Sequence, residues 1–378
     1  MRLCKNGGNI MKLYKMELYK ICCRKIFIWG LVCVLLVFLL AFWIQVADER
    51  ATVDGITYTG YRAAQINKEI TEEFKGVLTD EKVTQIIEKY GFPGKVEQGW
   101  GYFRDANFLN EFVLDYLSNG YIRDWNDYKI ATDTYAIADC DLGKVAEITG
   151  KEIVLEYYHG WKAFLEVLAY GMIAGSVLLL FSLSSVFANE SQTKMLPLLF
   201  TSKEGRRKDI PAKIAAAFTV AIAVWSGIVL LDLLLCGIVF GLDGLHCYNG
   251  MVTGYLFSFW QNAMIPMNYY IIMVFLCSFI GMFSLCAITI CISALNKNSF
   301  HAVVTAAVCW GLPVLLCMFA GGFYGAAKIL AAAPVFMVIY RVIEDIYNYW
   351  NVTIGIAVIV SVLCITVSYR KYYGRQSV

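Results

Sequence analysis

The chain has 378 residues, of which 59% are hydrophobic and 16% are charged. A soluble globular domain carries about 25% charged residues, so the composition argues against a wholly soluble protein. The formal net charge of +2 gives no indication of a nucleic-acid partner, and the basic residues are expected to face anionic lipid headgroups.

Six apolar stretches are each long enough to cross a bilayer core, which needs about 20 residues at 1.5 Å per residue. Because these stretches do not alternate polar and apolar residues, they predict helices rather than the strands of a barrel. They cover residues 27–46, 162–188, 214–240, 269–295, 302–320 and 352–369. The predicted fold class is therefore an all-α polytopic membrane protein with six transmembrane helices.

The segment 1–26 precedes the first of these helices. Within it, residues 11–25 place apolar side chains at helical spacing opposite a basic face, which is typical of an elbow helix lying in the membrane interface. Residues 1–10 show no such pattern, so either Met1 or Met11 is a possible start. The apolar run that follows is too long for a cleaved signal peptide and lacks a small-residue cleavage site.

The distribution of basic residues predicts the orientation. Seven Lys or Arg residues precede residue 27, six lie in 189–213 and three lie in the tail 370–378, whereas 241–268 has none. Cytoplasmic loops carry the excess of Lys and Arg. Both termini and the segment 189–213 are therefore expected in the cytoplasm.

Residues 47–161 form a long acidic insert between the first two spans, with a charge balance of −9 against +11 for the rest of the chain. Its regularly spaced aromatic residues predict a folded, mainly helical extracytoplasmic domain. Thr79 to Gly91 is typical of a capped helix, and Asp105 to Ser118 predicts a second one. Residues 130–156 are compatible with short strands or with helix.

Two further outer segments, 241–268 and 321–351, are apolar but interrupted by glycine, asparagine or charged residues. We expect re-entrant or interfacial helices there, because irregular backbone at membrane depth survives only under a cover of protein or water.

The sequence shows no motif for catalysis or metal binding. It lacks a phosphate-binding loop, and its three histidines are scattered. Its 13 cysteines lie mostly in apolar stretches without metal-ligand spacing. We therefore expect no catalytic residue, no metal and no cofactor in this chain.

Asp232 is the clearest ionisable residue within a predicted span. A carboxyl group at this depth costs several kcal/mol and usually faces a cavity or a partner. Both a substrate-path or cation-binding role and a structural hydrogen bond are compatible with the sequence.

The segment 189–213 is short, basic and partly apolar, which suits docking to a cytoplasmic partner. Together with the elbow helix and the six spans, it resembles the permease subunit of ABC-2-type exporters, particularly those of Gram-positive bacteria. The residues that match the coupling pattern of that family most specifically are Phe187, Glu190, Thr193, Leu198, Leu199, Thr201, Ser202, Gly205, Arg206 and Lys213.

The resemblance implies a bacterial cell-membrane protein that is a transport component rather than an enzyme. It implies an ATPase partner that binds ATP and Mg²⁺ and contacts Glu190, Thr193, Leu198, Leu199, Arg206 and Lys213. It also implies a second permease chain, the same or a sister, and an amphipathic substrate such as a peptide, an antibiotic or a lipid-like molecule.

Two other functions remain open at this point. A membrane sensor or assembly factor would use the outer domain to bind a ligand and the loops to recruit a partner. A membrane-embedded enzyme would need paired acids or histidines within the spans, and the sequence offers no such pair.

Overall fold

The computed structural model describes the greater part of the chain. The described residues are 2–95, 103–120, 131–193, 208–253, 265–322, 325–340 and 350–374.

Within these residues, six helical segments are long and apolar enough to cross a membrane. One of them combines α7 (His159–Leu183) and α8 (Ser185–Gln192), which a turn at Ser184 separates. The others are α2 (Lys25–Asp48), α10 (Asp209–Val239), α13 (Met267–Leu295), α14 (Ser299–Phe319) and α17 (Trp350–Gly374). The prediction of a mostly helical chain with six such segments is confirmed.

The helices extend beyond the apolar stretches that predict them. Helix α10 begins at Asp209 rather than 214, and α17 continues to Gly374 rather than 369. Hydropathy detects only the apolar part of a span, whereas the backbone hydrogen bonds continue into polar residues. Lys213, which the sequence analysis assigns to the loop 189–213, is therefore a residue of α10, and Glu190 is a residue of α8.

The chain divides into two compact units. Unit 1 comprises Met1–Leu39, Leu168–Leu231 and Met273–Val378, and unit 2 comprises Leu40–Val167 and Asp232–Ile272.

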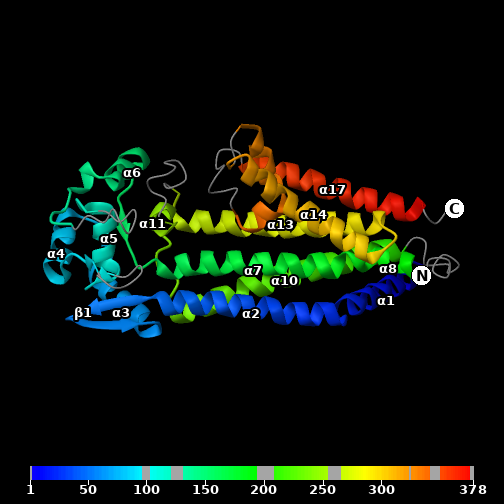
Figure 1. Ribbon diagram of the computed structural model, residues 1–378, viewed down its shortest axis with the longest axis horizontal. Helices are drawn as coiled ribbons and strands as arrows, with labels where there is room; N and C mark the ends of the chain where they lie inside the picture. Colours follow the sequence, from blue (N-terminus) through cyan, green and yellow to red (C-terminus); the bar gives the residue numbers. More distant parts are fainter. Residues whose placement is uncertain are drawn as a thin grey trace. The chain divides into compact units, whose positions relative to one another are not determined.

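Close helix packing characterises unit 1 (Figure 1). A Cβ atom at Gly175 of α7 would lie 2.8 Å from Ile228 Cδ1 of α10, so these two helices pack closely at a small residue. The N-terminal helix α1 (Arg2–Cys22) joins them, because the Tyr14 hydroxyl donates to Thr219 of α10 over 2.9 Å. The short helices η2 (Gly325–Ala332) and α15 (Pro334–Val338) pack against α14.

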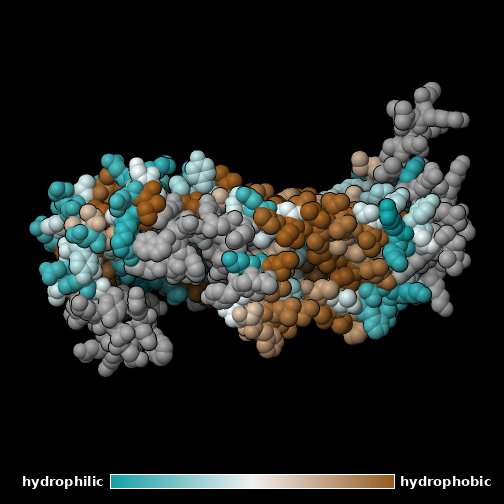
Figure 2. Space-filling view, turned by 90° about the horizontal axis from the view of Figure 1, so that it is seen from above, coloured by the Kyte–Doolittle hydropathy of each residue, from teal (hydrophilic) through white to brown (hydrophobic). Residues whose placement is uncertain are grey.

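The outer faces of the unit 1 helices are apolar, as Figure 2 shows for one side. Large hydrophobic side chains are exposed along α14 and α17, among them Val304, Val308, Leu312, Leu315, Val358, Ile359, Val362 and Leu363. Such a continuous apolar surface is much larger than soluble proteins expose, and it suits contact with lipid chains.

Unit 2 contains a β-hairpin and several short helices. Strands β1 (Arg50–Val53) and β2 (Ile56–Thr59) pair antiparallel around Asp54 and Gly55, which both have positive φ. Two such residues form the tight turn that suits a two-residue hairpin. Helix α3 (Tyr61–Phe74) packs on the hairpin and contacts α5 (Phe108–Leu117).

The remaining elements of unit 2 are small. Two further antiparallel pairs join β3 (Gly76–Val77) to β6 (Val154–Leu155) and β4 (Gly94–Lys95) to β5 (Phe103–Arg104). The helices are α4 (Asp80–Tyr90), η1 (Ile137–Asp139), α6 (Asp141–Thr149) and α11 (Asn249–Thr253). The interval 130–156, left open by the sequence, thus contains η1, α6 and β6.

The capping residues decide where the two predicted helices of this region begin. Thr79 accepts a hydrogen bond from the Lys82 amide, so the helix predicted from its sequence is confirmed as α4. Helix α5 begins at Phe108, three residues later than predicted, because Asn107 forms a capping box with Asn110.

A buried carboxylate organises unit 2. Glu49 accepts hydrogen bonds from Asn67 Nδ2 at 2.7 Å and the Tyr157 hydroxyl at 3.1 Å, and His159 Nδ1 lies 3.0 Å from it. The Asn67 side-chain oxygen in turn accepts from the Phe108 amide over 3.1 Å. The pKa of Glu49 is raised by burial, but His159 and the hydrogen bonds outweigh burial and hold it below the usual 4.5.

The lowered pKa of Glu49 predicts an acid-dependent loss of stability. Because the folded state binds the proton more weakly than the unfolded state does, the stabilisation is complete above pH 4.5 and is lost as pH falls through the folded value. Heat denaturation of the full chain in detergent should therefore show wild type more stable than Glu49→Gln at pH 7 and pH 5. The difference should shrink below pH 4.5. A difference that persists unchanged to pH 3 would contradict this.

The contact between α13 and α15 gives a second prediction. A Cβ atom at Gly281 would lie 2.6 Å from the backbone nitrogen of Val338, which cannot move aside as a side chain can. Gly281→Ala should therefore lower the melting temperature of the purified protein. Gly355→Ala is the matched control, because Gly355 lies in α17 with no atom near its Cβ position, and alanine favours a helix by about 1 kcal/mol over glycine.

Candidate functional site

The candidate site lies in unit 1, around helix α8. The hydroxyl of Ser293 in α13 accepts hydrogen bonds from the backbone amides of Phe187 at 2.9 Å and Ala188 at 3.2 Å. The Ser299 amide of α14 donates to the Gln192 side-chain oxygen over 3.1 Å. Because these bonds fix both ends of a helix of only eight residues, the side chains of α8 are held against α13 and α14.

Glu190 of α8 is buried, with both carboxylate oxygens in contact with partners. The Tyr372 hydroxyl of α17 donates to Oε2 over 2.5 Å, and Lys213 Nζ of α10 lies 3.0 Å from Oε1. The ring of Tyr372 also packs on Phe187, with 4.6 Å between centroids. A buried carboxylate needs such partners, since burial without them is strongly unfavourable.

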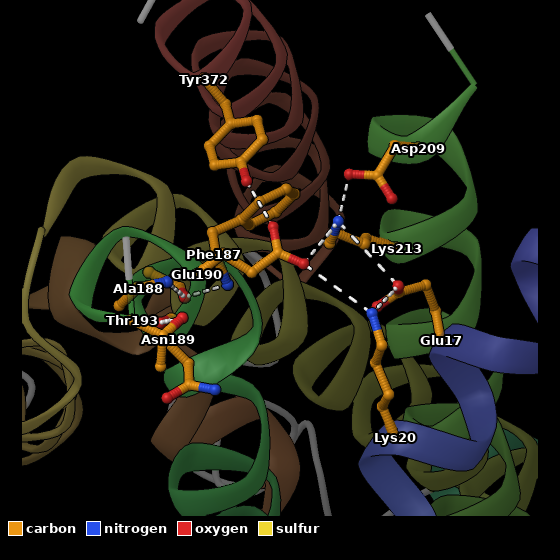
Figure 3. A network of polar contacts seen from close by, with 11 residues as sticks. Glu17, Lys20, Phe187, Ala188, Asn189, Glu190, Thr193, Asp209, Lys213 and Tyr372 are labelled. Atoms are coloured by element: carbon orange, nitrogen blue, oxygen red, sulfur yellow. Dashed lines mark hydrogen bonds and ion pairs between the residues drawn. The ribbon is translucent and has the colours of Figure 1, made fainter. Parts of the chain in front are cut away.

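Lys213 lies at the centre of the network (Figure 3). Its side chain is 0% exposed and contacts three carboxylates, which are those of Asp209, Glu190 and Glu17. The separation from Glu17 is 4.0 Å. Asp209 precedes Lys213 by one turn at the first residue of α10, where the helix dipole favours a negative charge.

Helix α1 contributes the carboxylate of Glu17 and the ammonium group of Lys20 to this cluster. Glu17 is buried, and Lys20 Nζ lies 2.6 Å from Glu17 and 3.9 Å from Glu190. Arg24, just after α1, donates to the hydroxyl of Ser185 at the start of α8. Burial lowers the pKa of Arg24, and the carboxylates of Glu17 and Glu190 oppose that effect, so Arg24 acts as a third cation.

The charged cluster is defined by Glu17, Lys20, Arg24, Glu190, Asp209 and Lys213, with Tyr372 as its hydroxyl donor. Its three carboxylates are balanced by three cations. Four elements meet in it: α1, α8, α10 and α17. Because removing one member leaves a buried charge without its partner, the cluster holds these elements together.

The predicted coupling residues have different surroundings. Glu190 and Lys213 are buried and in contact, whereas Thr193 is exposed and closes α8, its hydroxyl donating to the Asn189 carbonyl over 2.9 Å. Leu198, Leu199 and Arg206 lie outside the described residues. The charged cluster thus lies at both ends of the segment 194–207.

Asp232 belongs to unit 2 and is separate from the cluster. Its side chain is buried, and the Cys236 thiol one turn later donates to Oδ1 over 3.4 Å.

Sequence reasoning missed Asp209, Lys20, Tyr372 and Ser293 as members of the site. The spacing of four residues between Asp209 and Lys213 was a usable signal, because such pairs face each other on a helix. No local pattern marks Tyr372, which is 182 residues from Glu190.

The cluster is suited to mechanical connection rather than to chemistry. Its carboxylates and ammonium groups are occupied by one another. Among the described residues, no group of three or more His, Cys, Asp or Glu is arranged to hold a metal ion.

Removing the central cation should destabilise the protein strongly. Lys213→Met keeps the unbranched stem of the side chain without the ammonium group and leaves three carboxylates with less balancing charge, so a loss of about 3–5 kcal/mol in unfolding free energy is expected. The double variant Lys213→Met with Glu190→Gln should recover part of the lost unfolding free energy, because a neutral amide then replaces one of the unbalanced carboxylates.

Chemical denaturation of the purified variants measures both effects. Lys12→Ala is the control, because Lys12 is exposed on α1 and its loss should cost little. If Lys213→Met were as stable as Lys12→Ala, the cluster would not hold unit 1 together.

Compared with protein-family models, with curated proteins and with solved structures, the chain matches none.

Proposed function

We propose that this chain is the membrane permease subunit of an ATP-binding-cassette exporter of the ABC-2 type. It moves an amphipathic substrate, such as a peptide, an antibiotic or a lipid-like molecule, outward across a bacterial cell membrane. A separate ATPase subunit binds ATP and Mg²⁺ and supplies the energy, and this chain needs no cofactor of its own.

The observation that supports this proposal most directly is the position of the charged cluster. Glu190 and Lys213 lie at the two ends of the basic segment 194–207 and contact each other over 3.0 Å. A partner that pulls on this segment therefore acts on α8 and α10 together. Glu17 extends the connection to α1, and Tyr372 extends it to α17.

The same contacts suit both termini being cytoplasmic. Glu17 of α1 and Tyr372 of α17 belong to one cluster, and Figure 1 shows these two helix ends at the same end of unit 1. Lysine and arginine residues are concentrated in these segments and in 194–208. The excess of basic residues favours the cytoplasm for this end, where an ATPase would be available.

Within the proposed coupling site, some residues position the segment 194–207 and others contact the ATPase. Because Glu190 and Lys213 are engaged with each other, they position the base of the segment, and the ATPase is contacted by residues of the segment itself. Arg206 offers a charge-assisted hydrogen bond, while Leu198 and Leu199 offer apolar side chains to a groove on the partner.

A second permease chain completes the proposed exporter. Helices α2 and α14 have the least buried apolar windows of the six, at 17% and 11%. Their exposed apolar faces leave surface for lipid and for a second set of six helices.

The proposal predicts that an ATPase purifies with this chain. The tagged protein is extracted from its native membranes in mild detergent and captured, and nucleotide-binding proteins in the eluate are identified by mass spectrometry. Wild type should bring down one ATPase. Arg206→Ala should lower its recovery about tenfold, which corresponds to about 1.4 kcal/mol, on the order of one charge-assisted hydrogen bond. The pair Leu198→Ala with Leu199→Ala should lower it about tenfold or more, because two apolar side chains no longer fill the groove on the partner.

Lys371→Ala is the matched control, because Lys371 is an exposed basic residue of α17 and its loss should leave recovery unchanged. If the folded, monodisperse wild type brings down no nucleotide-binding protein, the exporter proposal fails. The sensor or assembly function would then be favoured.

A further inference from the structure

Asp232 lies on the buried side of α10, in line with other buried residues. Val224, Ile228, Asp232 and Cys236 follow one another at intervals of four residues, and all four are buried. Residues four apart lie on the same helix face. The carboxyl group of Asp232 therefore lies among buried apolar side chains of α10 and does not face the surface.

The two oxygens of this carboxyl group differ in their surroundings. Oδ1 accepts the weak hydrogen bond from the Cys236 thiol at 3.4 Å. Oδ2 is buried and has no hydrogen-bond partner among the described residues. Cys236 is the titratable group in contact with the carboxyl, and no ion pair to Asp232 occurs within the part of the chain that the structure describes.

An ionised carboxylate in such a place is strongly unfavourable, because no cation of the described residues lies close enough to compensate its charge. A metal ion would need several oxygen ligands, about six or more for Mg²⁺ or Ca²⁺, whereas the described residues bring together one carboxyl and one thiol here. A proton needs only one oxygen. We propose that Asp232 is a proton-binding site, with the proton on Oδ2 while the carboxyl is closed to water.

The proposal goes beyond the export function and does not depend on it. A proton on Oδ2 leaves Oδ1 as the acceptor of the Cys236 thiol, so the observed hydrogen bond is kept. Release of the proton requires water or a base to reach Oδ2. Asp232 would then lose its proton when water or a base reaches Oδ2 and regain it when the carboxyl is closed to water again.

Infrared spectroscopy of the full-length protein in lipid nanodiscs tests this directly. The spectrum of Asp232→Asn is subtracted from that of wild type at several pH values from 6 to 10. At pH 6 and 7 the difference should contain the carbonyl stretch of a protonated carboxyl group. Carboxylate bands should replace it as pH rises. Carboxylate bands already present at pH 6 would overturn the proposal.

Variants of Cys236 test whether the thiol contact acts on the same proton. Cys236→Ala removes a donor that stabilises the carboxylate, so the transition should move to higher pH. Cys236→Ser offers a stronger donor and should move it to lower pH. If Asp232→Asn does not fold, Asp232→Glu replaces it as the reference, and the carbonyl band should then shift rather than disappear. An unmoved band would overturn the assignment to Asp232.

Discussion

The ammonium group of Lys213 must be neutralised inside the protein, because its side chain has no access to water. This requirement brings Asp209, Glu190 and Glu17 to one place, and each of them comes from a different part of the chain. A buried ion pair is seldom stabilising relative to apolar packing. In the observed arrangement of α1, α8, α10 and α17, each of these charges has a partner, and we infer that the cluster contributes specificity to the packing of these helices.

Three buried acids among the described residues differ in their hydrogen-bond partners. Glu190 is balanced by lysine and hydroxyl donors, and Glu49 of unit 2 is balanced by His159, Asn67 and Tyr157. The hydrogen-bond partner of Asp232 among the described residues is the Cys236 thiol. The first two acids fix the positions of neighbouring elements because their partners come from several of them. Among the described residues, Asp232 is hydrogen-bonded only within its own helix, and that contrast favours a role in which its charge changes.

Sequence reasoning recovers what depends on local composition. Apolar stretches predict six spans, and Thr79 predicts the start of α4, because hydropathy and capping act over a few residues. It fails for what depends on distant partners. Glu190 and Lys213 are predicted to contact an ATPase, but nothing in the sequence indicates that they contact each other or that Tyr372 joins them. Long-range pairing is a property of the packed helices.

Because the carboxylates of the cluster and Lys213 are buried, their contacts determine how a force on the segment 194–207 would be transmitted to the helices. Separating Glu190 from Lys213 would leave charges of opposite sign unpaired in an apolar surrounding, at a cost of about 3–5 kcal/mol for one partner. Moving α1, α8, α10 and α17 together breaks none of these contacts. A rigid movement of the group is therefore energetically easier than bending at the ends of the segment. An energy source acting there would shift several membrane-crossing helices at once, which is the requirement that a driven export cycle places on its membrane subunit.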